Sequence, residues 1–134
     1  MGCQGSKEYA CVIRDEISAC IDKIPGKDVV VFATPLYFMG PTAQLKLLMD
    51  RMYSLFKFYT QPGKPESVFN PKAIALVATA GSGEFQALEQ TFKMVAEFSG
   101  AQFKPFLVPF AGKSGDLKNN AEIKVKAIDF GRSL

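Results

Sequence analysis

Two uninterrupted apolar runs constrain the fold of this chain more strongly than any other feature of its sequence. They are VVVFA within residues 28–34 and AIALVATA within residues 73–81. Each run is short and lacks the polar-apolar alternation of a strand with one face in water, so each is typical of a parallel strand covered on both faces. A loop and a helical pattern follow each run, and this order predicts an α/β fold with an open parallel sheet and helices on both faces.

Apolar residues at three- and four-residue steps predict four helices around these strands. The helices are expected over residues 15–24, 41–56, 85–100 and 119–130, and the charged start of the first is interpreted as a helix cap. Pro41 is expected at the first position of the second helix, where proline is tolerated. Cys20 is expected on the buried side of the first helix. The last helix is predicted to present one apolar face made of Leu117, Ala121, Val125 and Ile128.

A third strand is predicted over residues 103–110, where Pro105 and Pro109 interrupt an apolar run. Proline donates no hydrogen bond to a ladder, so this strand is expected at an edge of the sheet. Residues 58–71 are polar and rich in proline, and they are predicted to form a long surface loop that acts as a mobile flap. With about three strands and no internal repeat, residues 1–134 are expected to form a single domain.

Composition narrows the classes of partner. The chain has 134 residues, 48% of them hydrophobic, and its 16 basic and 13 acidic side chains give a net charge of +3. This charge is spread along the chain, so no nucleic-acid partner is expected. No apolar stretch is long enough to span a membrane and the first residues do not resemble a signal peptide. No membrane association is therefore expected, and a cytoplasmic location is predicted.

The absence of histidine limits the chemistry that the side chains can perform. The chain has no histidine, no tryptophan, and three cysteines at positions 3, 11 and 20. Pairs of serine or cysteine with histidine are thereby excluded, and so are most zinc sites. No metal site and no individual catalytic residue is predicted. A bound cofactor is then the main route to catalysis.

Three glycine-containing loops follow the predicted strands, at residues 35–40, 80–83 and 111–115. Ligands of open parallel sheets bind at the carboxyl ends of the strands, where these loops are expected. The first loop, PLYFMG, puts three large apolar side chains between a strand and a helix. One interpretation is a site for a flat apolar ligand, and the other is that Tyr37 and Phe38 are ordinary core aromatics.

The sequence resembles the flavodoxin-like NAD(P)H-dependent FMN reductases, a family that includes the iron-sulfur flavoproteins. The resemblance rests on GC and CVIRDEI within residues 2–17, VVVFATPLYFMGPTAQLKLLMDRMYSLF at 29–56, and ALVATAGSGE at 75–84. It implies an FMN-dependent oxidoreductase that takes electrons from NAD(P)H, with the flavin along the loops after the first two strands. The residues implied to bind the flavin are Pro35, Leu36, Tyr37, Phe38, Met39, Ala80, Gly81, Ser82 and Gly83.

The chain departs from this family in two respects. The family begins with a strand, a phosphate-binding loop, a helix and a second strand, and this N-terminal βαβ part is absent here, so an N-terminally truncated domain is expected. GSGE is the nearest substitute for the phosphate loop, but Glu84 would place a negative charge beside the phosphate. The iron-sulfur branch needs four closely spaced cysteines, whereas Ser6 stands where one is expected, and Cys3 and Cys11 alone cannot hold a cluster. No iron-sulfur cluster is therefore expected.

The absent first strand would pair with residues 28–34, and its absence leaves that strand with a bare edge. Either the sequence is a fragment or a partner chain covers this edge, and a homo-oligomer is expected, formed through the bare edge or through the helix at residues 45–56. Two functional hypotheses remain open. One is an FMN-dependent oxidoreductase, and the other is a non-catalytic flavodoxin-like interaction module that dimerises and binds no flavin on its own.

Overall fold

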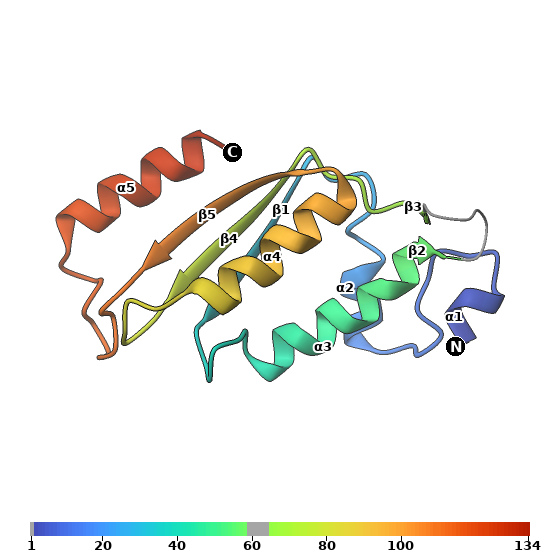
Figure 1. The fold of residues 1–134 in the computed structure, drawn as a ribbon, viewed down its shortest axis with the longest axis horizontal. Helices are drawn as coiled ribbons and strands as arrows, with labels where there is room; N and C mark the ends of the chain where they lie inside the picture. The colour runs from blue at the N-terminus through green and yellow to red at the C-terminus, as the bar shows by residue number, and fades with distance from the viewer. Residues whose placement is uncertain (1, 59–64) are drawn as a thin grey trace.

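Three parallel strands form the centre of the protein, shown in Figure 1 as a computed structural model that describes residues 2–58 and 65–134. The strands are β1 (Val29–Pro35), β4 (Ala73–Thr79) and β5 (Gln102–Val108), and their order in the sheet is β1-β4-β5. The middle strand β4 pairs with both neighbours, so that Ala73 lies opposite Val29 on one side and Gln102 on the other. The predicted open parallel sheet is confirmed, with the proline-containing strand at an edge.

Helices of different lengths surround the sheet. They are α1 (Gly2–Gly5), α2 (Glu16–Ile21), α3 (Ala43–Arg51), the 3-10 helix η1 (Met52–Leu55), α4 (Gln86–Ser99) and α5 (Ala121–Arg132). Two short strands, β2 (Phe56–Lys57) and β3 (Glu66–Ser67), pair with each other in antiparallel fashion. In Figure 1, α4 crosses the front of the sheet with α3 below it, and α5 lies beyond β5. Within the described ranges, no helix has both the length and the apolar character that a membrane span requires.

Helices cover both faces of the sheet, as the alternation of side chains along β5 shows. Phe103 and Leu107 point to one face, where they pack against the core that α4 shares. Phe106 points to the other face and stacks on Phe130 of α5, with 5.2 Å between the two ring centroids. The prediction of helices on both faces is confirmed.

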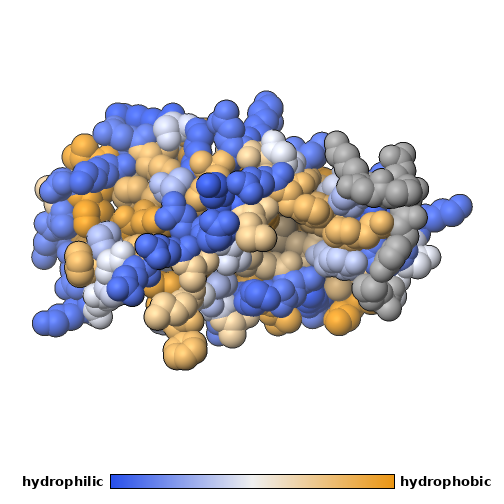
Figure 2. All heavy atoms as spheres, viewed as in Figure 1, coloured by the Kyte–Doolittle hydropathy of each residue, from blue (hydrophilic) through white to orange (hydrophobic). Residues whose placement is uncertain are grey.

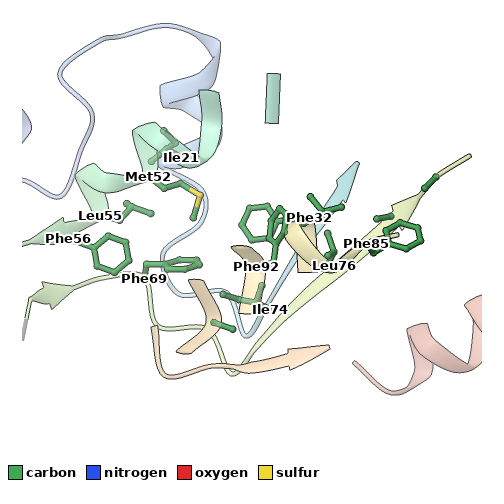
Figure 3. Packing of buried hydrophobic residues seen from close by; sticks show 14 residues of the cluster. Ile21, Phe32, Met52, Leu55, Phe56, Phe69, Ile74, Leu76, Phe85 and Phe92 are labelled. Atoms are coloured by element: carbon green, nitrogen blue, oxygen red, sulfur yellow. The ribbon is translucent and has the colours of Figure 1, made fainter. Parts of the chain in front are cut away.

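The hydrophobic core lies between the sheet and α4. Leu76 of β4 is fully buried, and so are Leu88 and Phe92 of α4. The ring centroid of Phe92 lies 5.2 Å from that of Phe32 in β1, and Figure 3 shows the two rings side by side. Burial of each large apolar side chain contributes about 1.5–3 kcal/mol. This cluster therefore fixes α4 to the sheet, and with it the loop that joins β4 to α4.

A charged cluster fixes the start of α2. Asp15 is the N-cap residue: its carboxylate accepts a hydrogen bond from the Ser18 amide at 3.0 Å, and the Ser18 hydroxyl accepts one from the Asp15 amide at 2.9 Å. Arg51, at the end of α3, donates to both carboxylate oxygens of Asp15 at 2.7 and 2.8 Å. The Arg51 hydrogen bonds, with those from the backbone, lower the pKa of Asp15 to about 2. These charged residues form the helix cap that the sequence predicts.

The second predicted helix is divided in the structure. The α-helix ends at Arg51, a 3-10 helix follows, and Phe56 begins β2. Pro41 is not the first helical residue, because Thr42 is the N-cap residue of α3. The prediction was wrong here because Phe56 and Lys57 pair with residues 66–67 in β3, and residues 54–57 are all buried. The spacing of apolar residues does not show contacts with a distant segment.

Two predictions of buried helix faces were also wrong. Cys20 is exposed on α2. In α5, Val125 and Ile128 are 58% and 55% exposed, because this helix packs on the sheet through Phe130 instead. Spacing alone identified the helix but not the side that faces the sheet.

The predicted surface loop at residues 58–71 contributes to the core. Phe69 is 1% exposed and its ring packs edge-on against Phe56, with centroids 5.9 Å apart. Residues 66–67 form β3, which pairs with β2. The mobile flap was predicted for the whole loop, and residues 59–64 of it lie outside the described residues.

One edge of the sheet is unpaired within the described part of the chain. β1 is an outer strand that pairs with β4 alone in the three-stranded sheet. The bare strand edge that the sequence predicts is therefore present in the structure. Val31 is 49% exposed and Ala33 is exposed as well, so the prediction that this strand is covered on both faces was wrong.

Candidate functional site

The candidate site is built from loops at the carboxyl ends of the three parallel strands. Residues 36–42 follow β1, residues 80–85 follow β4, and residues 109–120 follow β5. Because the strands are parallel, these loops lie at the same edge of the sheet (Figure 1). This is the edge at which open α/β sheets bind ligands.

The base of the loop after β1 is closed by the buried Thr34. Its hydroxyl accepts a hydrogen bond from the Thr42 amide at 3.1 Å and donates one to the Pro35 carbonyl at 2.8 Å. The Leu36 amide donates to the Thr79 carbonyl at 2.7 Å, which ties the loop to the end of β4. Pro35 and Leu36 are half-buried and form the rigid base of the loop rather than its surface.

The tip of this loop is a strained two-residue turn. Tyr37 and Gly40 exchange two backbone hydrogen bonds of 3.0 Å, and the two residues between them, Phe38 and Met39, have positive φ angles of 45° and 66°. Such a turn favours asparagine and glycine, and a non-glycine residue in the left-handed region costs on the order of 1–3 kcal/mol. Phe38 is fully exposed, while Tyr37 and Met39 are 64% and 61% exposed. The loop therefore holds three large apolar side chains in water on a strained backbone.

The loop after β4 offers backbone donors next to this turn. Ala80 is buried, and its amide donates to the Val108 carbonyl at 3.1 Å. Gly81, Ser82 and Gly83 are exposed, and their amides donate no hydrogen bond to any residue in ranges 2–58 and 65–134. Three neighbouring amides are thus available to a ligand.

The loop after β5 lies in van der Waals contact with the loop after β4, and glycines of both loops lie at the contact. A Cβ atom added to Gly112 would lie 3.4 Å from the Cα atom of Gly81. A Cβ atom added to Gly83 would lie 3.4 Å from the Cζ atom of Phe110. Phe110 itself is 75% exposed and has a positive φ of 57°. Sequence reasoning missed this residue, although an aromatic between Pro109 and a glycine loop at a strand end was a usable signal.

The first two loops of the site form an apolar surface with a polar edge and little charge, whereas the loop after β5 carries Lys113, Asp116 and Lys118. Residues 35–40 and 80–83 contain no acidic or basic side chain. Glu84 follows directly, and Glu89 lies in the first turn of α4, whose N-cap residue Phe85 makes no side-chain cap. Acidic groups at a helix N-terminus oppose the binding of a phosphate there. The geometry therefore suits a flat apolar ring with hydrogen-bond acceptors along one edge.

Of the sequence-predicted site residues, the structure brings the two loops together but divides their roles. Three residues expose large apolar side chains, three expose backbone amides, and the remaining three anchor the loops. In that order they are Tyr37, Phe38, Met39, then Gly81, Ser82, Gly83, then Pro35, Leu36, Ala80. Contact of any of these nine with a flavin stays a prediction.

The cysteines lie apart from this edge. Cys11 is buried, and the Nε atom of Arg51 donates to its sulfur at 3.4 Å, while Cys3 and Cys20 are half-buried and exposed. In the part of the chain that the structure describes, no three His, Cys, Asp or Glu side chains are grouped to hold a metal ion.

A hollow lies between α3 and α4, away from the carboxyl edge of the sheet. Its volume is about 690 Å³, and Figure 2 shows apolar side chains gathered around it. Its aromatic lining consists of Phe32, Tyr53, Phe56, Phe58, Phe69 and Phe98. Met94 and Phe98 on its rim are 58% and 52% exposed. Phe98 lies at the end of α4 that leads into β5, so the hollow is near the amino ends of the strands.

Comparison with known proteins agrees with this architecture. Residues 2–113 match the family of NADPH-dependent FMN reductases. A putative NAD(P)H-dependent FMN-containing oxidoreductase of Bacillus subtilis is 23% identical over 107 residues, which are 78% of this chain and 59% of that protein. An iron-sulfur flavoprotein of Methanocaldococcus jannaschii is 31% identical over 94 residues, 67% of this chain and 45% of that protein.

A solved structure shares this fold. An NAD(P)H:quinone oxidoreductase from Methanothermobacter marburgensis superposes with a TM-score of 0.65 at 14% identity, covering 97% of this chain and 68% of that one. The chain belongs to the NADPH-dependent FMN reductase family. It spans about half the length of the two relatives it matches, at 59% and 45%.

Proposed function

We propose that this chain takes part in FMN-dependent oxidoreduction with NAD(P)H as the electron donor. The observation that carries the proposal is the strained turn from Tyr37 to Gly40, which exposes three apolar side chains beside the free amides of residues 81–83. Backbone strain that the fold maintains at an exposed loop is characteristic of ligand sites. Membership of the FMN reductase family and the names of the relatives support the same cofactor.

The described residues fit the ring of FMN better than its phosphate. The side chains of Tyr37, Phe38 and Met39 would contact the apolar face of the ring, as aromatic and thioether groups do. The amides of Gly81, Ser82 and Gly83 would donate to the carbonyl oxygens and to N5 at its polar edge. The flavin itself supplies the redox chemistry when bound. The part of the protein in this chain orients the ring and shields one side of it from water.

Anaerobic reduction of FMN tests this proposal. The purified chain is mixed with FMN, NADPH or NADH is added, and loss of the visible absorption band of the flavin is followed against a protein-free mixture. We expect faster loss with the protein, a reduced effect for Tyr37→Ala, and an unchanged rate for Ile128→Ala, an exposed residue of α5. No acceleration with either donor, and no flavin retained by the protein, would instead favour the non-catalytic interaction module.

We also propose that the chain forms a homo-oligomer. Two apolar surfaces support this: the unpaired edge of β1, which carries Val31, and the rim of the hollow with Met94 and Phe98, which are 58% and 52% exposed. An exposed strand edge invites uncontrolled pairing unless another chain covers it. At micromolar concentration we expect sedimentation as a dimer or larger species. Val31→Lys should dissociate an edge-paired assembly, Met94→Lys one formed through the helices, and a stable wild-type monomer would contradict the proposal.

A further inference from the structure

We propose that Phe110, in the loop after β5, is a third binding element of the flavin site and covers the ring from the side opposite the Tyr37–Gly40 turn. This inference rests on the proposed function. It adds a residue outside the nine predicted ones and assigns a ligand contact to a loop that the sequence resemblance did not include.

The contacts of Phe110 place its ring on the amide-bearing loop. Its Cζ atom is the nearest neighbour of Gly83, at 3.4 Å from the position of an added Cβ atom. Its amide donates to the Ser82 carbonyl at 3.4 Å, and the next amide, of Ala111, donates to the Ala80 carbonyl at 2.8 Å. These two backbone hydrogen bonds, to residues 80 and 82, hold the ring beside the three available amides.

The order of the strands puts this ring on the far side of the site from Tyr37. β4 is the middle strand, so its loop lies between the loop of β1 and the loop of β5. Neighbouring strands are about 4.8 Å apart, so the two outer loops start roughly 10 Å from each other. A flat ring over residues 81–83 would thus meet aromatic side chains on both sides, with hydrogen-bond donors beneath its edge.

A purely structural role explains Phe110 poorly. Three-quarters of the residue is exposed, so it contributes little apolar burial to the fold. Its φ of 57° is unfavourable for an aromatic residue and suits asparagine or glycine. In the free protein this side chain adds strain and little burial. A ligand that covered its ring would explain why the residue is aromatic, and the same holds for the strained Phe38.

Replacing Phe110 with asparagine separates the two roles, because asparagine tolerates a positive φ and lacks the ring. We expect unfolding in denaturant to be unchanged or shifted to higher denaturant concentration. Titration with FMN and with riboflavin should show binding of both weakened by roughly fivefold to tenfold, the scale of one aromatic contact. Phe110→Tyr should keep the affinity for both flavins, and Ile128→Ala should not change it.

Each other outcome has a defined meaning. If the wild-type protein binds flavin and Phe110→Asn binds it with the same affinity, the inference is overturned and the proposed function stands. A loss of stability in Phe110→Asn with unchanged binding would show a structural role and overturn it as well. Failure of the wild-type protein to bind either flavin would overturn the proposed function and this inference together.

Discussion

Replacing Phe92 with alanine is expected to lower the free energy of unfolding by about 3–5 kcal/mol, the range measured for buried aromatic residues. Phe92 is fully buried, and its ring packs 5.2 Å from that of Phe32, centroid to centroid. The substitution removes this contact and leaves a cavity between α4 and the sheet, which the surrounding helix and strands cannot fill without moving. Denaturant titration followed by circular dichroism measures the change.

Lys93→Ala is the matched control for this experiment, because Lys93 is the next residue of α4 and its side chain is exposed. Exposed substitutions of this kind change stability by less than about 0.5 kcal/mol. Equal losses for the two variants would mean that the buried face of α4 has been assigned incorrectly. A loss of less than about 1 kcal/mol for Phe92→Ala would mean that this core is not well packed in solution.

Replacing Tyr37 with alanine is expected to weaken FMN and riboflavin equally, by about 1–3 kcal/mol for each ligand. Tyr37 is 64% exposed in the free protein, so a ring that covers it would bury apolar area that is now in water. Its amide and carbonyl close the strained turn, and alanine keeps both backbone hydrogen bonds. The loss of affinity therefore measures the contact of the side chain and not a change in the shape of the loop. Fluorescence quenching of each flavin on titration gives the two affinities.

Unequal losses in Tyr37→Ala would show that this side chain also senses the phosphate. Unchanged affinity for both ligands would remove Tyr37 from the site and leave Phe38 and Met39 as the apolar contacts of the turn. Ile128→Ala, on the exposed side of α5, controls for effects of an apolar surface substitution far from the turn.

The parallel sheet could be predicted because each of its first two strands is a short apolar run followed by a loop and a helical pattern. The runs lie within residues 28–34 and 73–81, and the structure places strands at Val29–Pro35 and Ala73–Thr79. Pro105 indicated the edge position of the third strand, since a proline has no amide to donate to a second neighbour. The burial of β4 agrees with its apolar pattern, whereas Val31 of β1 is exposed although its run is equally apolar.

The region after α3 could not be predicted because distant contacts decide its structure. Lys57 is buried, and its Nζ atom donates to the carbonyls of Cys3 and Glu8 at 2.6 and 2.7 Å. Phe56 packs against Phe69, thirteen residues further along the chain. The spacing of apolar residues does not show that an N-terminal segment covers this lysine. The pattern therefore predicts a helix as far as residue 56, whereas α3 ends at Arg51.

The candidate site could be predicted only in part from the sequence, because distant contacts also decide the shape of its loops. The resemblance identified the loops after β1 and β4, and the structure joins them through the Leu36 amide and the Thr79 carbonyl. The positive φ angles of Phe38, Met39 and Phe110 depend on how each loop is closed by the strands around it. Their residue types disfavour that conformation, so propensity points away from the backbone that is found.

The most direct test of the central claim is a comparison of FMN with riboflavin as ligands of the wild-type protein. In the proposed site, the Tyr37–Gly40 turn and the amides of residues 81–83 would hold the flavin ring, and Glu84 and Glu89 would disfavour a phosphate at the start of α4. Fluorescence titration should therefore give weak affinities that agree within about threefold, because these acidic groups give the phosphate of FMN no advantage in binding. Binding of FMN a hundredfold or more tighter than riboflavin, about 2.7 kcal/mol, or no binding of either, would contradict it.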